Sequence, residues 1–374
     1  MRLEEICTVF TDGDWIESKD QSDDGIRLVQ TGNIGEGIYL EKEARAKYIS
    51  EETFEKLKCT EIFPGDILVS RLPDPIGRAC IIPEKEERMI TAVDCTICRP
   101  NESIISKEYL CYFMRSSAYY KRLLGSVTGT TRKRISRKNL GNVELEVPSK
   151  ERQMDVVEQL DCLVKVIESR KQELQLLDNL IKARFVEMFG NPVTNEKRWK
   201  QKLLGEITTK IGSGATPKGG KSAYQENGIT LIRSMNVHNG MFEYKELAHI
   251  SDEQATKLDN VVIEENDVLL NITGASVARS CVVPSKILPA RVNQHVCIIR
   301  CKECIIPEFL NKLLIDDNYQ KLLWSIAGAG ATREAITKQQ VESLQIIMPP
   351  VELQNEFMRF CHQVDKSKFI QQII

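Results

Sequence analysis

The chain has 374 residues, of which 42% are hydrophobic and 28% are charged, and its formal net charge at pH 7 is −2. This length predicts more than one domain, and the composition is typical of a soluble globular protein and excludes a disordered or fibrous chain. No apolar run reaches the roughly 18 residues of a membrane span. The first residues, MRLEEICTVF, are acidic where a secretion signal would be basic and then apolar. We therefore expect a cytoplasmic protein whose twelve cysteines are mostly reduced and buried.

Basic residues are concentrated in two segments of this nearly neutral chain. Residues 121–138 contain seven Lys and Arg residues and no acid, and residues 197–221 contain seven Lys and Arg residues and one Glu. Local basic patches on a neutral chain suit a protein that contacts nucleic-acid phosphates with selected faces only.

The first 150 residues predict a mixed α+β domain. Short β-rich runs such as DILVS (66–70) are bounded by Pro, Gly or Asn, a helical stretch covers 107–124, and VELEVP (143–148) predicts a last strand. A Gly-Thr-Arg loop, TGTTRKRISRKN (128–139), lies between that helix and that strand.

Residues 151–189 contain no Gly or Pro and predict one long amphipathic helix. Its apolar residues recur every seven positions, at Leu160, Ile167, Leu174 and Ile181, which is typical of a coiled coil. At 1.5 Å per residue the helix spans on the order of 58 Å. The sequence Gly-Asn-Pro at 190–192 ends it.

The second half of the chain repeats the first. Residues 250–354 align without gaps on residues 49–153, at an offset of 201 residues, and residues 228–240 align on 25–37 after a register change of two. The identities include Asp66 with Asp267, Arg78 with Arg279, Arg99 with Arg300, and Gln153 with Gln354. A repeat of this length is a duplicated domain rather than a solenoid unit. The second copy has its own Gly-Thr-Arg loop, AGATREAIT (329–337), which is much less basic than the first.

The second copy also ends in a helix, but a shorter one, over 351–374. Leu353, Phe357, Phe360 and Val364 follow a 4-3-4 spacing and predict its apolar stripe. Neither helix can bury its stripe alone, so we expect the two to pack against each other. The second is about 15 residues shorter than the first, so part of the first would lack a partner.

Several loops carry side chains suited to contacts with DNA. Gly allows close backbone approach, while hydroxyl, amide and guanidinium groups bond phosphate oxygens or base edges. The alternative is structural: an Arg that pairs inside the protein, or a turn that simply requires Asn. The candidate DNA contacts are Arg27, Gln30, Thr31, Asn33, Arg71, Arg78, Thr130, Thr131, Arg132, Lys133, Arg134, Thr216, Lys218, Arg233, Ser234, Asn236, Asn271, Thr273, Arg279, Asn293, Gln294, Thr332 and Arg333.

Motifs for catalysis or metal binding are weak. The loop GSGATPKGGKS (212–222) fails the phosphate-loop pattern, because Gly220 stands where Lys is required. The Cys297, Cys301 and Cys304 spacing resembles that of an iron–sulfur cluster, and Cys95 with Cys98 could form half a zinc site, but both sets fall in apolar runs that predict buried strands. We expect no catalytic residue and no metal in this chain.

The arrangement resembles the DNA specificity subunit of type I restriction–modification enzymes. The segments that carry the resemblance are GDWIESKDQSDDGIRLVQTGNIGEG (13–37), VPSKERQ (147–153), LIKARFVEMFGNP (180–192), GSGATP (212–217) and PPVELQ (349–354). The resemblance implies an α+β fold with two duplicated target-recognition domains, joined by long antiparallel coiled-coil spacer helices. It assigns residues 1–150 and 191–350 to the domains, and 151–190 and 351–374 to the helices.

The resemblance also implies a non-catalytic function. Each domain would read one half of a bipartite target in double-stranded DNA, and the helices would dock two methyltransferase subunits and possibly restriction/translocase subunits. S-adenosylmethionine, ATP and Mg would belong to those partners. The alternative is a tandem-domain DNA-binding scaffold or regulator that acts without a methyltransferase.

Overall fold

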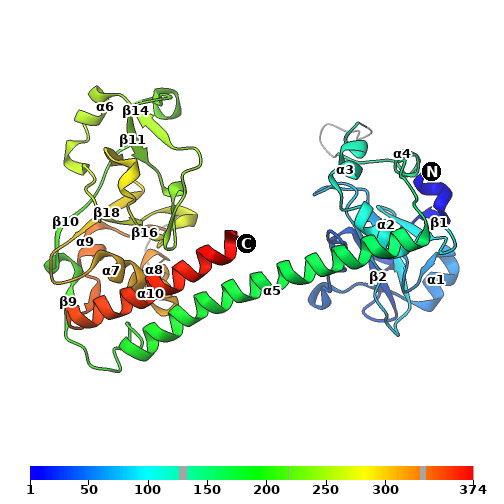
Figure 1. The fold of residues 1–374 in the computed structure, drawn as a ribbon, viewed down its shortest axis with the longest axis horizontal. Helices are drawn as coiled ribbons and strands as arrows, with labels where there is room; N and C mark the ends of the chain where they lie inside the picture. The colour runs from blue at the N-terminus through cyan, green and yellow to red at the C-terminus, as the bar shows by residue number, and fades with distance from the viewer. Residues whose placement is uncertain (126–132, 218, 329–333, 374) are drawn as a thin grey trace. The chain divides into compact units, whose positions relative to one another are not determined.

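The computed structural model describes residues 1–125, 133–217, 219–328 and 334–373. The chain forms two compact units, Met1–Glu168 and Ser169–Ile374, which are described separately. Both are mixed α+β units, as the sequence predicts (Figure 1). Among the helices in these ranges, none is long and apolar enough to cross a membrane.

The first unit contains two four-stranded sheets. One has the strand order β1-β8-β5-β6 and the other β3-β2-β7-β4. The strands are β1 (Cys7–Asp12), β2 (Ile26–Val29), β3 (Tyr48–Ile49), β4 (Glu61–Ile62), β5 (Ile67–Ser70), β6 (Ala79–Ile81), β7 (Met89–Thr91) and β8 (Cys95–Pro100). The helices are α1 (Glu51–Leu57), α2 (Lys107–Phe113), α3 (Ser117–Leu124) and α4 (Arg137–Gly141).

The second unit repeats this plan. Its four-stranded sheet has the order β10-β18-β15-β16, and a three-stranded sheet has the order β14-β11-β17. The strands are β9 (Gln201–Leu203), β10 (Thr208–Ser213), β11 (Ile229–Ile232), β12 (Val237–His238), β13 (Met241–Phe242), β14 (Ala248–Ile250), β15 (Val268–Asn271), β16 (Ser280–Val282), β17 (Ala290–Val292), β18 (Val296–Cys301) and β19 (Gln345–Ile347). The helices are α6 (Asp252–Thr256), α7 (Pro307–Leu314), α8 (Asp317–Gly328), α9 (Lys338–Glu342) and α10 (Val351–Ile373).

One repeated ion pair shows that several identities between the copies are structural. Arg99 binds Asp66 with two parallel hydrogen bonds of 2.7 and 2.8 Å, and Arg300 binds Asp267 in the same way at 2.8 and 2.9 Å. Both carboxylates are buried, and each also accepts a backbone N–H from the turn before its strand. Bidentate, charge-assisted bonds of this kind fix the turn that leads into β5 or β15.

The structure corrects two predicted elements. The predicted helices over 107–124 and 307–324 are each broken in two, because Ser116 and Asp316 accept backbone N–H groups and start a new helix. The predicted strand 143–148 is reduced to a single bridge between Glu144 and Arg2, whereas its counterpart forms β19.

The structure also corrects the ungapped repeat alignment. Most strands match at an offset of 201 residues, but α2 and α7 start at Lys107 and Pro307, and α3 and α8 at Ser117 and Asp317, which is an offset of 200. The buried tyrosines Tyr119 and Tyr319 match at that offset too. The second copy is therefore one residue shorter just before α7, and its Gly-Thr-Arg loop regains the difference, since the buried Ile135 and Ile336 match again at 201.

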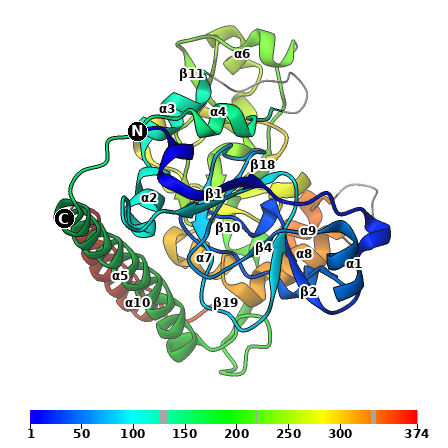
Figure 2. The same ribbon diagram turned by 90° about the vertical axis from the view of Figure 1, so that its right-hand side faces the viewer.

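The helix α5 runs over Lys150–Phe189, as the sequence predicts. Within the second unit its C-terminal part packs on α10, and Figure 2 shows the two helices side by side. Ile181, Phe357 and Val364 are buried in their shared core, and Leu353 and Phe360 are partly buried against it. Rings of Phe185 and Phe189 meet Phe357 edge-on, with centroids 5.5 Å apart in both pairs.

The predicted heptad stripe of α5 is only partly covered. Leu160 and Leu174 are half-buried, and the side chain of Ile167 is 52% exposed. The packing predicted for Leu160, Ile167 and Leu174 against a spacer helix therefore stays a prediction. The domain boundaries at 150, 190 and 350 also stay predictions.

Candidate nucleic-acid interface

In each unit several of the described candidate DNA contacts lie at one end of a four-stranded sheet, β1-β8-β5-β6 or β10-β18-β15-β16. In the first unit this is the end where β1 and β5 finish and β8 begins, since Asp12 pairs with Thr96 and Ser70 with Cys95. In the second unit it is the corresponding end of β10, β15 and β18. We call this region of each sheet the polar end. Antiparallel pairing brings together loops that lie far apart in the sequence.

Backbone hydrogen bonds attach both Gly-Thr-Arg loops to the polar ends. Ile135 donates its N–H to the carbonyl of Arg71 at 3.2 Å, and Ile336 donates to Ile272 at 2.8 Å. Gly274 donates to the carbonyl of Glu334 at 2.9 Å. The described residues that follow each loop are therefore bonded to the polar ends. Thr130, Thr131, Arg132, Thr332 and Arg333 lie outside the described residues, as does Lys218, so DNA contact by them stays a prediction.

At the polar end of the second unit, four side chains form a continuous hydrogen-bonded row. Thr216 donates to Gln294 Oε1 at 2.5 Å, Gln294 Nε2 lies 3.1 Å from His295 Nε2, and His295 Nδ1 lies 2.5 Å from Thr273 Oγ1. Thr216 and Gln294 are exposed. The hydroxyl and amide groups of this row can both donate and accept hydrogen bonds. The row therefore suits base edges as well as phosphates.

The polar end of the first unit is charged instead. Arg71 lies 3.3 Å from Asp12, and Arg134 lies 2.9 Å from Asp94. Arg71 is buried, and this burial lowers the pKa of its guanidinium, although the nearby carboxylate of Asp12 opposes the shift. Lys133 is exposed. Arg137, which the sequence prediction omits, lines a surface hollow with Arg71 and Asp12; its signal in the sequence is the basic run at 121–138.

Two predicted contacts hold turns in place. Asn33 accepts the N–H of Gln30 and donates to the carbonyl of Leu40, and Asn236 does the same with Arg233 and Glu243. Both side chains are buried. The structural alternative, a turn that requires Asn, therefore describes what these side chains do in the free protein, and DNA contact by either stays a prediction.

Three predicted arginines have internal contacts. Arg27 is buried with its guanidinium 5.3 Å from the ring centre of Tyr48. Arg233 stacks on Tyr224 at 5.5 Å and donates to the carbonyl of Glu246. Arg78 donates to four backbone carbonyls. Contact between these side chains and DNA would require them to leave those partners.

The remaining candidates differ in exposure. Gln30, Thr31, Ser234, Thr273 and Arg279 are half-buried at the polar ends, while Asn271 and Asn293 are buried behind them. Asn271 donates to the carbonyl of Ser234, and Asn293 accepts the N–H of His295. Trp15 is not among the predicted DNA contacts, although its side chain is 70% exposed. Trp15 lies two residues after Gly13, just as Thr216 lies two residues after Gly214.

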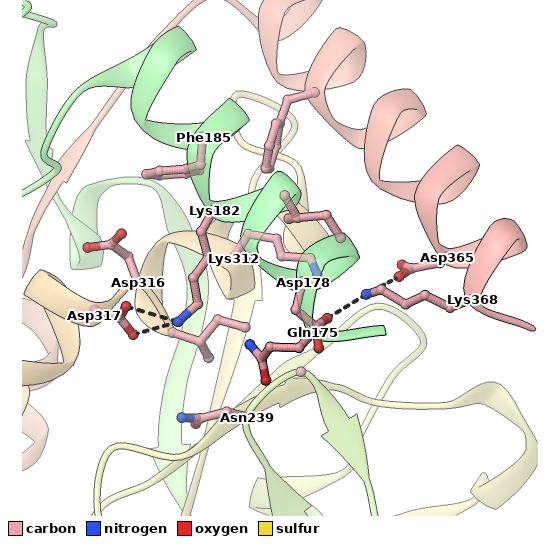
Figure 3. Close-up of a pocket in the computed structure, with 14 residues that line it drawn as sticks. Gln175, Asp178, Lys182, Phe185, Asn239, Lys312, Asp316, Asp317, Asp365 and Lys368 are labelled. Carbon is pink, nitrogen blue, oxygen red and sulfur yellow. Dashed lines mark hydrogen bonds and ion pairs between the residues drawn. The ribbon is translucent and has the colours of Figure 1, made fainter. Parts of the chain in front are cut away.

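In the second unit, a polar cleft of about 440 Å³ is lined by side chains of α5, α8 and α10 (Figure 3). Lys182 of α5 bonds both carboxylate oxygens of Asp317 at the start of α8, at 2.9 and 3.0 Å. Lys368 of α10 bonds Asp178 of α5 at 2.6 Å and Asp365 at 3.0 Å. Phe185 and Phe357 line the same cleft. These contacts fix the domain to the helix pair.

A buried glutamine makes the same attachment in both units. Gln153 accepts the N–H of Ser106 at 2.8 Å and donates to the carbonyls of Ile104 and Pro148. Gln354 accepts the N–H of Ile306 at 2.9 Å and donates to Pro349 at 2.9 Å. Both side chains are fully buried, so each helix start is bonded to the loop before α2 or α7.

Of the cysteines in the two candidate metal motifs, Cys95, Cys98 and Cys297 are buried on strands, whereas Cys301 and Cys304 are only partly buried and Cys304 lies outside β18. Cys95 is on β8 and Cys297 is on β18, and burial raises the pKa of each thiol to about 12. A protonated thiol is a poor metal ligand. Within the described ranges, no group of three or more His, Cys, Asp or Glu side chains is placed to hold a metal ion. Gly214 of the phosphate-loop-like segment instead packs against the backbone of β17.

A duplicated α+β domain, a polar end on each copy and a helix pair that holds one copy define a class of two-headed binding protein. Comparison with known proteins identifies the family. The family model described as "Type I restriction modification DNA specificity domain" matches residues 1–179 and 196–374. The chain belongs to this family, and it is a DNA specificity subunit of a type I restriction–modification system, a kind of subunit that is not itself catalytic.

Individual relatives are distant. The chain is 21% identical over 335 residues to the putative type I restriction enzyme MjaX specificity subunit of Methanocaldococcus jannaschii, covering 85% of this chain and 76% of that protein. It is 18% identical to the EcoKI specificity subunit of Escherichia coli, covering 72% of this chain and 61% of that protein.

Solved structures share the fold. A chain from a study of complex assembly in the type I R-M system has a TM-score of 0.63 at 18% identity, with 100% of this chain and 92% of that chain covered. The specificity subunit from M. genitalium has a TM-score of 0.55 at 12% identity, with 100% and 90% covered.

Proposed function

We propose that each domain of this specificity subunit reads one half of a bipartite target in double-stranded DNA, and that α5 and α10 dock two methyltransferase subunits. The observation that supports this most strongly is the polar end, which occurs once per copy at the same place in the sheet. Two similar heads suit two half-sites, and side chains that differ between the heads suit half-sites of different sequence.

The chemistry of the reaction belongs to the partners. Methylation with S-adenosylmethionine, and translocation and cleavage with ATP and Mg by restriction subunits, are proposed for those subunits and not for this chain. The relatives in type I enzymes and the structure from a type I assembly support this division.

The test is to co-express the chain with the methyltransferase subunit of its own system and to map methylated adenines by single-molecule sequencing. We expect one motif with two specified halves of different sequence, separated by unspecified base pairs. A contiguous motif, or two identical halves, would contradict the proposal. A chain that purifies without any methyltransferase would favour the tandem-domain scaffold instead.

A further inference from the structure

Arg78 and Arg279 occupy the same backbone position in the two copies. Each directly precedes a strand, β6 or β16, and each carbonyl accepts the N–H of the residue that ends the neighbouring strand, Ser70 at 2.9 Å or Asn271 at 2.8 Å. Directly opposite residues of an antiparallel pair place their side chains on the same face. Arg78 is therefore the cross-strand neighbour of Ser70, and Arg279 is that of Asn271.

In the first domain this arginine is part of the scaffold. Arg78 is 9% exposed, and its guanidinium donates to the carbonyls of Thr31 at 2.7 Å, Ile34 at 2.7 Å, Leu72 at 3.0 Å and Pro75 at 3.1 Å. These four bonds join the turn η3 (Thr31–Asn33) to the loop that connects β5 with β6. The hydroxyl of Ser70 is too short to do this and bonds Leu72 instead.

In the second domain a different side chain binds the counterpart of one of these four acceptors. The counterpart of Thr31 is Ser234, at the start of the turn η7 (Ser234–Asn236). Its carbonyl accepts a hydrogen bond from Asn271 Nδ2 at 2.8 Å. Asn271 is longer than Ser70 and reaches the turn from the strand, so the turn no longer depends on the arginine.

Arg279 is released by this exchange. It is half-buried, and among the described residues its side chain makes no hydrogen bond or ion pair. Glu334, whose carbonyl lies beside Gly274, forms no ion pair with it in the same ranges. A guanidinium has five N–H donors, and in a structural role they are normally satisfied by the protein.

We propose that Arg279 is a DNA-contacting residue peculiar to the second domain, whereas its copy Arg78 is structural. The partner is a hydrogen-bond acceptor of duplex DNA, either a phosphate oxygen or the O6/N7 edge of guanine, which a free guanidinium binds in two-pronged fashion. The row from Thr216 to Thr273 lies at the same end of the sheet and supplies further hydrogen-bond donors and acceptors there. The inference rests on the proposed function and names one residue that serves it.

The first test compares Arg279→Gln, Arg78→Gln and Lys257→Gln in the full chain assembled with its methyltransferase subunits, using a fluorescein-labelled 40-base-pair duplex that carries the mapped methylation motif. Lys257 is a charge control, because it pairs with Glu253 on α6. We expect Arg279→Gln to weaken binding about tenfold with an unchanged melting temperature. Lys257→Gln should bind normally, and Arg78→Gln should lower the melting temperature.

The outcomes separate the inference from the proposed function. If the unmodified complex binds the duplex and the Arg279→Gln complex binds equally well, with an unchanged methylation motif, the inference is wrong and the function stands. If the unmodified complex neither binds the duplex nor methylates a two-part motif, the proposed function fails and the inference fails with it. A plot of log binding constant against log salt concentration whose slope falls by about one in Arg279→Gln indicates a phosphate partner. Loss of base preference at one position in one half of the motif indicates guanine.

A second test uses the exchange itself. Asn271→Ser introduces the residue of the first domain, so Arg279 should bind the carbonyl of Ser234 and DNA binding should weaken. Asn271 is completely buried, so this loss would not come from a DNA contact of its own. The double variant Asn271→Ser/Arg279→Gln should bind no more weakly than Arg279→Gln alone, because both changes remove the same contact. Additive losses would overturn the exchange.

Discussion

Glycine at position 214 is required by the close approach of two backbones at the second polar end. A Cβ atom there would lie 1.8 Å from the carbonyl oxygen of Val292, and the Gly214 N–H donates to Asn293. Gly13 repeats the arrangement, since its Cβ would lie 2.3 Å from the carbonyl oxygen of Thr91. The same contact in both copies places the loop after β1 or β10 against the residues that precede β8 or β18.

We predict that Gly214→Ala lowers the free energy of unfolding of the second domain by at least about 2 kcal/mol, because the backbone cannot yield to a methyl group without moving the loop. The matched control is Gly212→Ala, where a Cβ would meet nothing within 4 Å. Thermal unfolding of both variants checks this. Equal melting temperatures for the two would show that the loop adapts freely.

Residue types alone could not separate contacts from scaffold at these positions. The sequence places Asn33 and Asn236 after strands, and it pairs Arg78 with Arg279, but both patterns fit either role. What distinguishes the roles is which carbonyls lie within reach, as for Asn236 with Glu243 and Lys245. Those acceptors come from other turns, so their positions depend on the tertiary fold and not on local sequence.

At the scale of elements, the long helix and the repeat were predictable because both produce regular patterns. The heptad of α5 and the absence of Gly and Pro define its ends within one residue. The break between α3 and its neighbour α2 was not predicted, since Ser116 interrupts a helical pattern only through its capping bond to Tyr119. The strand predicted at 143–148 forms only one bridge, between Glu144 and Arg2. Its counterpart β19 forms a strand because it pairs with three residues of β9.

The α5–α10 packing supplies a prediction at this scale. Phe357 is fully buried among Phe185, Phe189 and Phe309. Phe357→Ala should lower the free energy of unfolding of the second unit by about 3–5 kcal/mol, because it leaves a cavity in the only aromatic cluster between α10 and α5 that the described residues contain. Urea unfolding followed by circular dichroism measures the change.

The control for that experiment lies on the same helix. Phe369 is 64% exposed, so Phe369→Ala removes a similar ring without opening a cavity and should leave the free energy of unfolding within about 0.5 kcal/mol of the original. If both variants unfold alike, the stability of the unit does not depend on the helix contact.

At the scale of the whole molecule, the two copies keep their scaffold and change their polar ends. The ion pairs Asp66–Arg99 and Asp267–Arg300 and the glutamines 153 and 354 repeat bond for bond. At the polar ends, by contrast, Asp94 corresponds to His295 and Asp12 to Ser213 in the strand registers. Divergence at the polar ends on a conserved framework is what the proposed reading of two different half-sites requires.

This division predicts that the domains can be exchanged independently. Replacing residues 191–350 with the corresponding domain of another family member should change one half of the methylated motif and leave the other half intact, because each polar end is built from one copy only. Lys182 and Gln354 lie outside the exchanged segment and stay in place, while Asp317 lies inside it, so the incoming domain should carry a carboxylate at that position to bind Lys182. The reciprocal exchange of residues 1–150 is the control and should change the other half. Methylation sequencing of both chimaeras decides the matter: if either exchange alters both halves, the two domains do not read DNA separately.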